Sequence, residues 1–392
     1  MSFFTETLGG LSTIRAFSQS NRFLKQHAGN LNENIRTLII KYGFEQWFTQ
    51  RITLVSFILV MTVTGITLFS DFEPGFAGLL LIYIFQIEGA LRYAISSLSY
   101  VECQLISFER CHSLCKIAPE QGYLTKDIKS RNFYSNENLK EVFETWPSKG
   151  EIKFKNVDIK YRVNLNFVLK NLTFSIKSNE KIGIVGRTGA GKSTLLRSLL
   201  RIIETSNGKI LIDDLDIRTL DLRDLRRRIT LIPQDVYLFE GTLKDNLDPN
   251  NEYEEEFIWD SLEKVGLKET FQKRKGLASE IKEQGGNLSD GEKQLISLSK
   301  AFLKHNKLIL IDEVTDNVDL ATEKRIIKII RKNLIGFTVL MIAHRIDSVM
   351  DADRVIVLER GEVVEFEAPG VLLENKGSMF YKMWQDSWGG RE

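Results

Sequence analysis

The sequence predicts two regions of different fold class: an all-α transmembrane helical hairpin, followed by an α/β domain of the phosphate-loop (P-loop) type. The first prediction rests on long uncharged apolar runs in the first third of the chain. The second rests on short apolar strands that alternate with helical patterns after residue 149, around one glycine-rich loop. With 392 residues, the chain is long enough for both regions. We expect the helical region at 1–115, a linker at 116–148 and the α/β domain at 149–392.

The helical region contains the apolar runs 52–69 and 76–87, and the second reaches span length when it is counted through residue 95. We therefore expect spans at about 47–69 and 75–96, joined by the turn at 70–75. A buried hairpin in a water-soluble protein is the alternative interpretation.

The charges around the two runs predict their orientation. The turn carries Asp71 and Glu73 but neither Lys nor Arg, whereas the flanks carry several basic residues. The bias of Lys and Arg toward the cytosol therefore places both ends of the hairpin, and the α/β domain, on the cytosolic side of a membrane.

The overall composition excludes some classes of protein. A net charge of +1 gives no field that would favour nucleic acid, so we expect no nucleic-acid partner. Three cysteines cannot form a fully paired disulfide framework. Cys111, His112 and Cys115 do not share one helix face, so free thiols are favoured over a metal site.

The α/β region is predicted from short apolar segments that are typical of strands. Several are continuous apolar runs, as expected of buried parallel strands. These segments are 152–154, 182–185, 210–212, 229–232, 308–311, 339–342 and 355–358.

A complete phosphate-binding loop follows the apolar strand at 182–185 and precedes a helical run at 195–200. A strand delivers such a loop and a helix receives it, so that backbone N–H groups point at phosphate. Lys192 supplies a charge for the phosphates, and the Ser193 hydroxyl a ligand for Mg²⁺. The alternative is a glycine-rich turn that binds nothing. The loop consists of Gly186, Arg187, Thr188, Gly189, Ala190, Gly191, Lys192, Ser193 and Thr194.

Two further segments carry polar residues that could serve a nucleotide. The strand at 308–311 ends in Asp312, placed to hold Mg²⁺, and Glu313, placed to orient or deprotonate an attacking water. Between the two motifs, Ser289 and Gly291 open a helical stretch, where N–H groups can bind an anion. Alone, the second segment is weak evidence, and an ordinary capped helix is its default interpretation.

The order of these motifs, with Ala343-His344-Arg345 after them, resembles the ATPase domain of ABC transporters. The resemblance implies that Tyr161 stacks on adenine and that Gln234 contacts Mg²⁺ and the membrane domain. It also implies that Asp319 is the D-loop aspartate and that His344 is the switch histidine at the γ-phosphate. Ser289 and Gly291 then belong to the signature motif.

The segments 232–249 and 6–17 resemble the multidrug-resistance-associated, or C, subfamily. The resemblance covers nearly the whole chain and begins inside a membrane domain. It implies the last two spans of the second membrane domain and the second nucleotide-binding domain. We expect a truncated piece of a longer transporter; a natural short protein that works with a partner chain is the alternative.

The resemblance implies a membrane exporter that couples ATP hydrolysis to efflux, with ATP and Mg²⁺ as cofactors. Its expected partners are a second ABC ATP-binding domain, the missing spans, the lipid bilayer and a small-molecule substrate, for which organic anions are suggested. Glu88, Arg92 and Tyr93 would face the pathway by analogy, and helix packing with snorkelling is the alternative. The plasma membrane and a vacuolar or other organellar membrane remain equal choices.

The signature departs from the family pattern, because Asp290 and Glu292 replace a small residue and a glutamine. Acids beside a triphosphate are repulsive, so this signature is expected to serve a weak or non-hydrolysing site. Two other functions stay open: a soluble ABC-type ATPase, and a nucleotide-gated regulator without transport.

Overall fold

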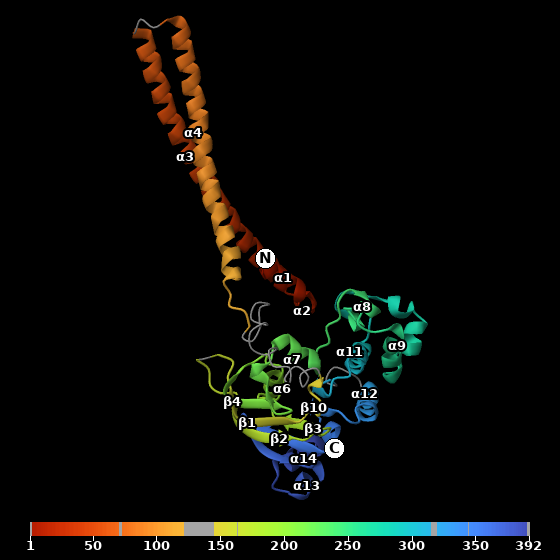
Figure 1. Cartoon of the computed structure of the whole chain (residues 1–392). Coiled ribbons are helices and arrows are strands. Elements are labelled where there is room, and N and C mark those ends of the chain that lie inside the picture. Colours follow the sequence, from red (N-terminus) through yellow and green to blue (C-terminus); the bar gives the residue numbers. More distant parts are fainter. Residues whose placement is uncertain are drawn as a thin grey trace. The chain divides into compact units, whose positions relative to one another are not determined.

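The computed structural model describes residues 2–69, 73–120, 145–162, 164–314, 320–343 and 345–389. The chain forms two compact units, Met1–Ala118 and Pro119–Glu392, which are considered separately (Figure 1).

The first unit is helical, as predicted, and its two longest helices run antiparallel and side by side (Figure 1). They are α3 (Ser20–Phe69) and α4 (Pro74–Cys115), and they contain the expected spans. Two short helices precede them, α1 (Ser2–Gly9) and α2 (Leu11–Ala16). Of the described residues, α3 forms the helix that is long and apolar enough to cross a membrane, and Pro74–Ile87 is a shorter apolar stretch. At 1.5 Å per residue, the 50 residues of α3 extend well beyond a hydrocarbon layer of about 30 Å.

The second unit contains a six-stranded sheet in the order β12-β11-β3-β10-β9-β6. All neighbours in it are parallel except β11 and β12. The apolar segments expected to be parallel strands form its centre, which confirms the α/β class. Its strands are β3 (Lys181–Gly186), β6 (Ile229–Ile232), β9 (Leu308–Asp312), β10 (Thr338–Ile342), β11 (Arg354–Glu359) and β12 (Glu362–Glu367).

A second sheet is antiparallel, in the order β2-β1-β4-β5, and the sequence prediction did not anticipate it. Asn156 and Asn171 have positive φ, and the register of β1 shifts against both β2 and β4. These irregularities break the alternation that marks a half-buried strand, which explains why β2 escaped prediction. The strands are β1 (Ile152–Ile159), β2 (Leu169–Ile176), β4 (Thr205–Ile212) and β5 (Leu215–Asp216).

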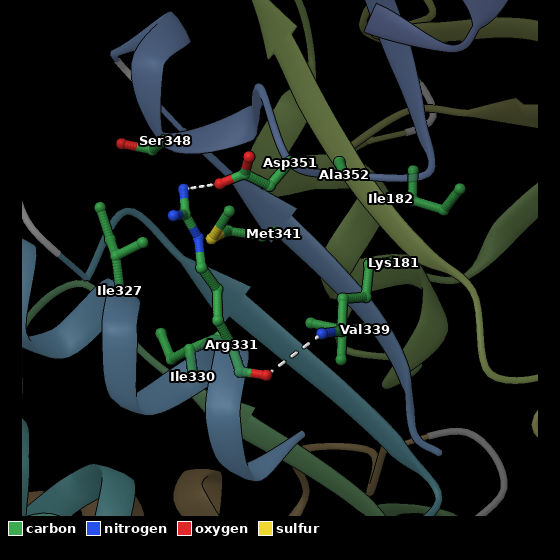
Figure 2. Close-up of a pocket in the computed structure, with 10 residues that line it drawn as sticks. All are labelled: Lys181, Ile182, Ile327, Ile330, Arg331, Val339, Met341, Ser348, Asp351 and Ala352. Carbon is green, nitrogen blue, oxygen red and sulfur yellow. Dashed lines mark hydrogen bonds and ion pairs between the residues drawn. The ribbon is translucent and has the colours of Figure 1, made fainter. Parts of the chain in front are cut away.

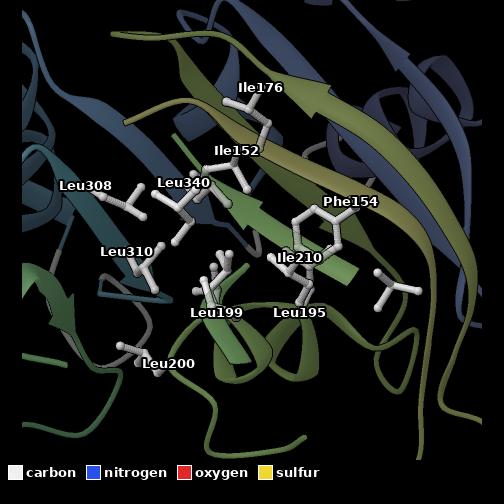
Figure 3. Close-up of a cluster of buried hydrophobic side chains, with 14 of the residues drawn as sticks. Ile152, Phe154, Ile176, Leu195, Leu199, Leu200, Ile210, Leu308, Leu310 and Leu340 are labelled. Atoms are coloured by element: carbon white, nitrogen blue, oxygen red, sulfur yellow. The ribbon is translucent and has the colours of Figure 1, made fainter. Parts of the chain in front are cut away.

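The helix α6 (Lys192–Leu199) packs its apolar side chains against residues of both sheets. Figure 3 shows Leu195 and Leu199 of α6 within the same buried cluster as Phe154 and Leu310. Trp146, inside the stretch expected to be a linker, is buried in this cluster and donates from Nε1 to the Ile212 carbonyl at 2.9 Å. The start of the P-loop helix is therefore fixed by a core that both sheets share.

A third group of elements forms a separate buried cluster around α11 (Asp290–Lys304). This helical subdomain has amphipathic helices, each with apolar residues on one side. Its other elements are β7 (Gly241–Thr242), α8 (Leu243–Leu247), α9 (Glu255–Lys264), α10 (Lys268–Gln272), β8 (Glu280–Ile281) and α12 (Leu320–Asn333). Three further α-helices among the described residues of this unit are α7 (Leu222–Arg228), α13 (Pro369–Glu374) and α14 (Met379–Gly389).

Candidate nucleotide-binding site

Three of the predicted site segments lie at the carboxyl ends of strands of the six-stranded sheet. The P-loop follows β3, Asp312 ends β9, and Gln234 lies two residues beyond the end of β6. The pairing of Ile232 with Ile311, in parallel strands, aligns the ends of β6 and β9. Ligands bind in such sheets at the carboxyl ends of the strands, so the topology gathers these side chains where a ligand is expected.

The P-loop requires glycine at Gly186 and Gly191 for two separate reasons. Both have positive φ, of 155° and 104°. A Cβ would lie 2.3 Å from the Leu358 carbonyl oxygen at Gly186, and 2.6 Å from Leu169 Cδ2 at Gly191. Only glycine allows this backbone to curl and pack so closely. The loop therefore has the conformation in which successive N–H groups can face an anion.

Lys192 and Ser193 occupy the first turn of α6, directly after the loop. Lys192 is buried, and its Nζ donates to the Gly186 carbonyl oxygen at 2.9 Å across the loop. Ser193 Oγ donates to Asp312 Oδ1 at 3.4 Å. A charged ammonium and a helix N-terminus thus converge on the space over the loop, while a hydroxyl and a carboxylate lie together beside it.

Burial raises the pKa of Asp312, and the neighbouring charge of Glu313 raises it further. The cations Arg197 and Lys192 and the hydrogen bond from Ser193 act in the opposite direction. A carboxylate kept partly out of water beside a second acid is a site that a cation would stabilise. Sequence reasoning missed Arg197, which lies in the P-loop helix four residues after Ser193.

Glu313 is buried and has a positive φ of 47°. Its backbone N–H donates to the Ile342 carbonyl oxygen of β10 at 3.3 Å. A non-glycine residue held in this conformation at the end of a strand is typical of functional sites. The backbone thus turns immediately after Asp312 and leaves two consecutive acids at the sheet edge.

Tyr161 lies near the P-loop helix, because its hydroxyl is 3.1 Å from Thr194 Oγ1. Its side chain is half exposed, so an aromatic face remains accessible at this edge of the site. Stacking on adenine stays a prediction.

The signature residues lie in the helical subdomain, at the start of α11. Ser289 and Glu292 form a capping box, in which the Glu292 N–H donates to Ser289 Oγ at 3.2 Å. A Cβ on Gly291 would lie 2.9 Å from Thr322 Cγ2, so glycine lets α11 approach α12 closely.

Both unusual acids of the signature have a cationic partner. Arg274 Nη2 lies 2.8 Å from Glu292 Oε1, and Lys293 Nζ lies 3.1 Å from Asp290 Oδ1. The repulsion expected from the sequence is therefore partly compensated within the subdomain itself.

Several predicted residues lie outside the described residues. They are His344, Asp319 and the side chains of Glu88 and Arg92. Tyr93 is described, and its side chain is exposed on α4.

A cavity at the opposite end of β3 is not the candidate site (Figure 2). Its lining includes Lys181 and Ile182, which begin the strand that ends at Gly186. Arg331 forms an ion pair with Asp351 across it. With a volume of about 40 Å³, it has room for very few waters and none for a nucleotide.

Comparison with known proteins agrees with this geometry. Residues 169–316 match the family model described as ABC transporter. The structure of a bacterial Atm1-family ABC exporter with ATP bound has the same fold, with a TM-score of 0.84. It is 22% identical, and the match covers 98% of this chain and 66% of that one. The fold and the site thus define an ABC-type P-loop ATPase domain that follows a helical membrane-type hairpin.

Curated relatives match nearly the whole chain. Metal resistance protein YCF1 of Saccharomyces cerevisiae is 38% identical over 98% of this chain and 25% of its own length. ABC transporter C family member 13 of Dictyostelium discoideum is 38% identical over 96% of this chain and 28% of its own length. Bile pigment transporter 1 of Saccharomyces cerevisiae is 37% identical over 98% of this chain and 25% of its own length. The chain belongs to the ABC transporter family, resembles its C family, and spans about a quarter of the length of these relatives.

Proposed function

We propose that this chain binds and hydrolyses ATP as the ATPase-bearing part of a membrane exporter. The P-loop supports this most directly: Gly186 and Gly191 set its curl, and the buried Lys192 crosses it. Glu313 and His344 are the residues expected to act on the attacking water and the γ-phosphate, with Tyr161 against the adenine. The D-loop residue Asp319 is expected to belong to the same machinery.

Mg²⁺ is the proposed metal, and the donors present suit it. Ser193 and Asp312 offer a hydroxyl and a carboxylate oxygen, which are hard ligands. Gln234 follows β6 at the same edge and would add an amide oxygen. When bound, the metal would neutralise charge on the phosphates. The protein's own part is to hold the Ser193 hydroxyl and the Asp312 carboxylate together at the carboxyl end of β9.

Transport is proposed from the relatives and from the first unit. The apolar window of α3 has no buried residues, as expected of a helix that contacts lipid or other spans. A second ABC ATP-binding domain and further spans would complete the exporter, in the same longer chain or another subunit. The substrate is proposed to be a small organic molecule, with organic anions favoured; a relative's name, bile pigment transporter, supports this class.

Two substitutions test the ATPase proposal in the membrane-embedded protein with its partners present. Lys192→Met should lower ATP affinity and reduce hydrolysis by about a hundredfold or more. Glu313→Gln should leave ATP binding intact and reduce hydrolysis to a similar extent. Lys181→Met, at the opposite end of the same strand, is the matched control and should change neither. Equal nucleotide binding by wild type and Lys192→Met would refute the proposed site.

A second candidate function, a nucleotide-gated regulator without transport, is supported by the unusual signature. In this family each signature faces the partner's P-loop, so Asp290 and Glu292 would weaken the partner's site. Because both acids are ion-paired, we expect Asp290→Gly to raise hydrolysis at that site only a few fold. No change at that site would count against the weak-site hypothesis.

Membrane fractionation separates the exporter from a soluble ABC-type ATPase. We expect the chain in the membrane pellet after a carbonate wash and in the supernatant after detergent. Recovery in the soluble fraction without detergent would favour the soluble alternative.

A further inference from the structure

Gln294 makes a contact that none of the sequence motifs predicts. Its side-chain Nε2 donates to the backbone carbonyl oxygen of Gln234 at 2.7 Å. The amide orientation follows from chemistry, because only the NH₂ group can donate to a carbonyl. The two residues are 60 positions apart in the sequence, so the contact joins α11 to the segment after β6.

The surroundings of Gln294 indicate that this contact matters. The residue is only 6% exposed, and its Oε1 has no hydrogen-bond partner among the described residues. A leucine of similar size could be buried here without leaving an acceptor unsatisfied, and an unsatisfied buried acceptor is destabilising. A half-satisfied amide in a buried position is therefore unexpected unless its donor group has a role.

The position of Gln294 shows what the contact can transmit. It lies in the first turns of α11, five residues after Ser289 and in the same helix as Asp290. With Gln234, Asp290 and Lys293 it also lines one cavity of about 360 Å³. One side-chain amide thus links the start of the signature helix to the backbone that carries Gln234.

We propose that Gln294 is a positioning residue that holds Gln234 in place for the metal and couples it to the signature helix. This inference rests on the proposed function, in which Gln234 serves this chain's own nucleotide and the signature faces a partner's. A movement of α11 at the partner's site would then displace Gln234, so the hydrogen bond would link the two sites.

The test uses the chain in lipid nanodiscs, with Mn²⁺ as the metal probe. Free Mn²⁺ is measured by its electron paramagnetic resonance signal with and without ATP, and ATP binding is measured separately in EDTA with a fluorescent analogue. Gln294→Leu removes the donor, and Gln294→Glu keeps the shape but turns a carboxylate oxygen toward the Gln234 carbonyl. The control is Gln284→Asn, which changes another amide of the same cavity at a residue whose φ of 55° asparagine tolerates.

Both Gln294 variants should bind Mn²⁺ in the presence of ATP roughly three- to tenfold more weakly than wild type. Their affinity for the analogue in EDTA should change less than about twofold, because the P-loop is untouched. The control should match wild type in both measurements.

Two results would overturn the inference. One is unchanged Mn²⁺ affinity in the Gln294 variants, even with a lowered Tm, since a purely structural role moves only Tm. The other is an equal shift in Gln284→Asn. If wild type shows no ATP-dependent Mn²⁺ binding, the proposed function itself fails and the inference falls with it. If Gln294→Leu does not fold, Gln294→Glu alone decides.

Discussion

The two units of this chain use apolar side chains in opposite ways. Among the described residues, Ile14 and Ile84 are the buried large apolar side chains of the helical unit, while most others along α3 and α4 are exposed. The second unit instead encloses its apolar residues in clusters on both faces of its main sheet. A chain that buries its own apolar surface folds by itself, whereas one that exposes it depends on lipid or on other helices. The second unit therefore buries its apolar surface within itself, whereas the helical unit needs lipid or other helices to cover its apolar surface.

The largest expected effect is on solubility, when the two units are produced as separate pieces. Residues 119–392 are expected to remain soluble without detergent, because their cores are internal. Residues 1–118 are expected to aggregate unless detergent or lipid covers α3. Sedimentation of each piece, with and without detergent, measures this. A soluble, monomeric 1–118 in plain buffer would contradict the comparison.

Truncating one aromatic ring in each unit sharpens the same contrast. Phe154 is 1% exposed and stacks on Phe174 at 4.5 Å between ring centroids, so Phe154→Ala should lower the free energy of unfolding by about 3–5 kcal/mol. Phe17 is 72% exposed, so Phe17→Ala should change it by less than about 0.5 kcal/mol.

Urea unfolding followed by tryptophan fluorescence measures both values. Trp146, buried in the same cluster as Phe154, reports on that core. If Phe17→Ala lowered the free energy of unfolding as much as Phe154→Ala does, the helical unit would have a core of its own.

Removing an ion pair near the start of the second unit should have an intermediate effect on the stability of that unit. Arg226 Nη1 donates to Glu120 Oε2 at 2.9 Å, and its Nε and Nη2 donate to the carbonyl oxygens of Leu200 and Arg201 at 3.0 Å each. It thus joins the chain just after α4 to the end of the P-loop helix. Arg226→Ala should destabilise the second unit by about 1–3 kcal/mol, because it removes several hydrogen bonds from a charged donor.

Arg227→Ala is the matched control for Arg226→Ala. Arg227 is the next residue in α7 and pairs with Glu252 on the surface, so its loss should cost less than about 1 kcal/mol. The hydrogen bond and charge of Arg226 lower the pKa of Glu120, so its stabilisation is present above the ordinary glutamate pKa and is lost as pH falls through the lowered value. A difference between the two variants that does not shrink toward acid pH would mean that Glu120 contributes nothing.

The predictability of each region follows from how local its determinants are. The P-loop, Asp312 and Glu313 were predicted because strand, loop and helix are adjacent in the sequence. The hairpin followed from run length alone. The strand β2 was missed because its buried residues do not alternate with exposed ones around Asn171, which has a positive φ.

Long-range contacts explain what else the sequence could not predict. The bond from Gln294 to Gln234 spans 60 residues, and that from Arg226 to Glu120 spans 106. Neither leaves a periodic or spaced pattern in the chain, since a single side chain meets a single backbone or carboxylate group. The compensation of Glu292 by Arg274, 18 positions away, likewise depends on folded geometry, whereas Lys293 and Asp290 are a local i,i+3 pair within α11.

The smallest expected effect is a change in Tm on substituting Asp312, and it distinguishes the role of this carboxylate in stability from its role in metal binding. Burial and the charge of Glu313 raise the pKa of Asp312, so the folded chain binds a proton there more readily than the unfolded chain does. The free energy of unfolding therefore decreases as pH rises from the ordinary aspartate pKa through the raised one. Asp312→Asn removes this loss, so in EDTA at pH 7.5 its Tm should be slightly higher than that of wild type. The same variant should lose ATP-dependent Mn²⁺ binding, because a carboxylate ligand is gone. The difference in Tm between Asp312→Asn and wild type should vanish below the ordinary aspartate pKa. A lower Tm for Asp312→Asn at pH 7.5 would contradict this prediction, because it would mean that the ionised carboxylate stabilises the folded chain.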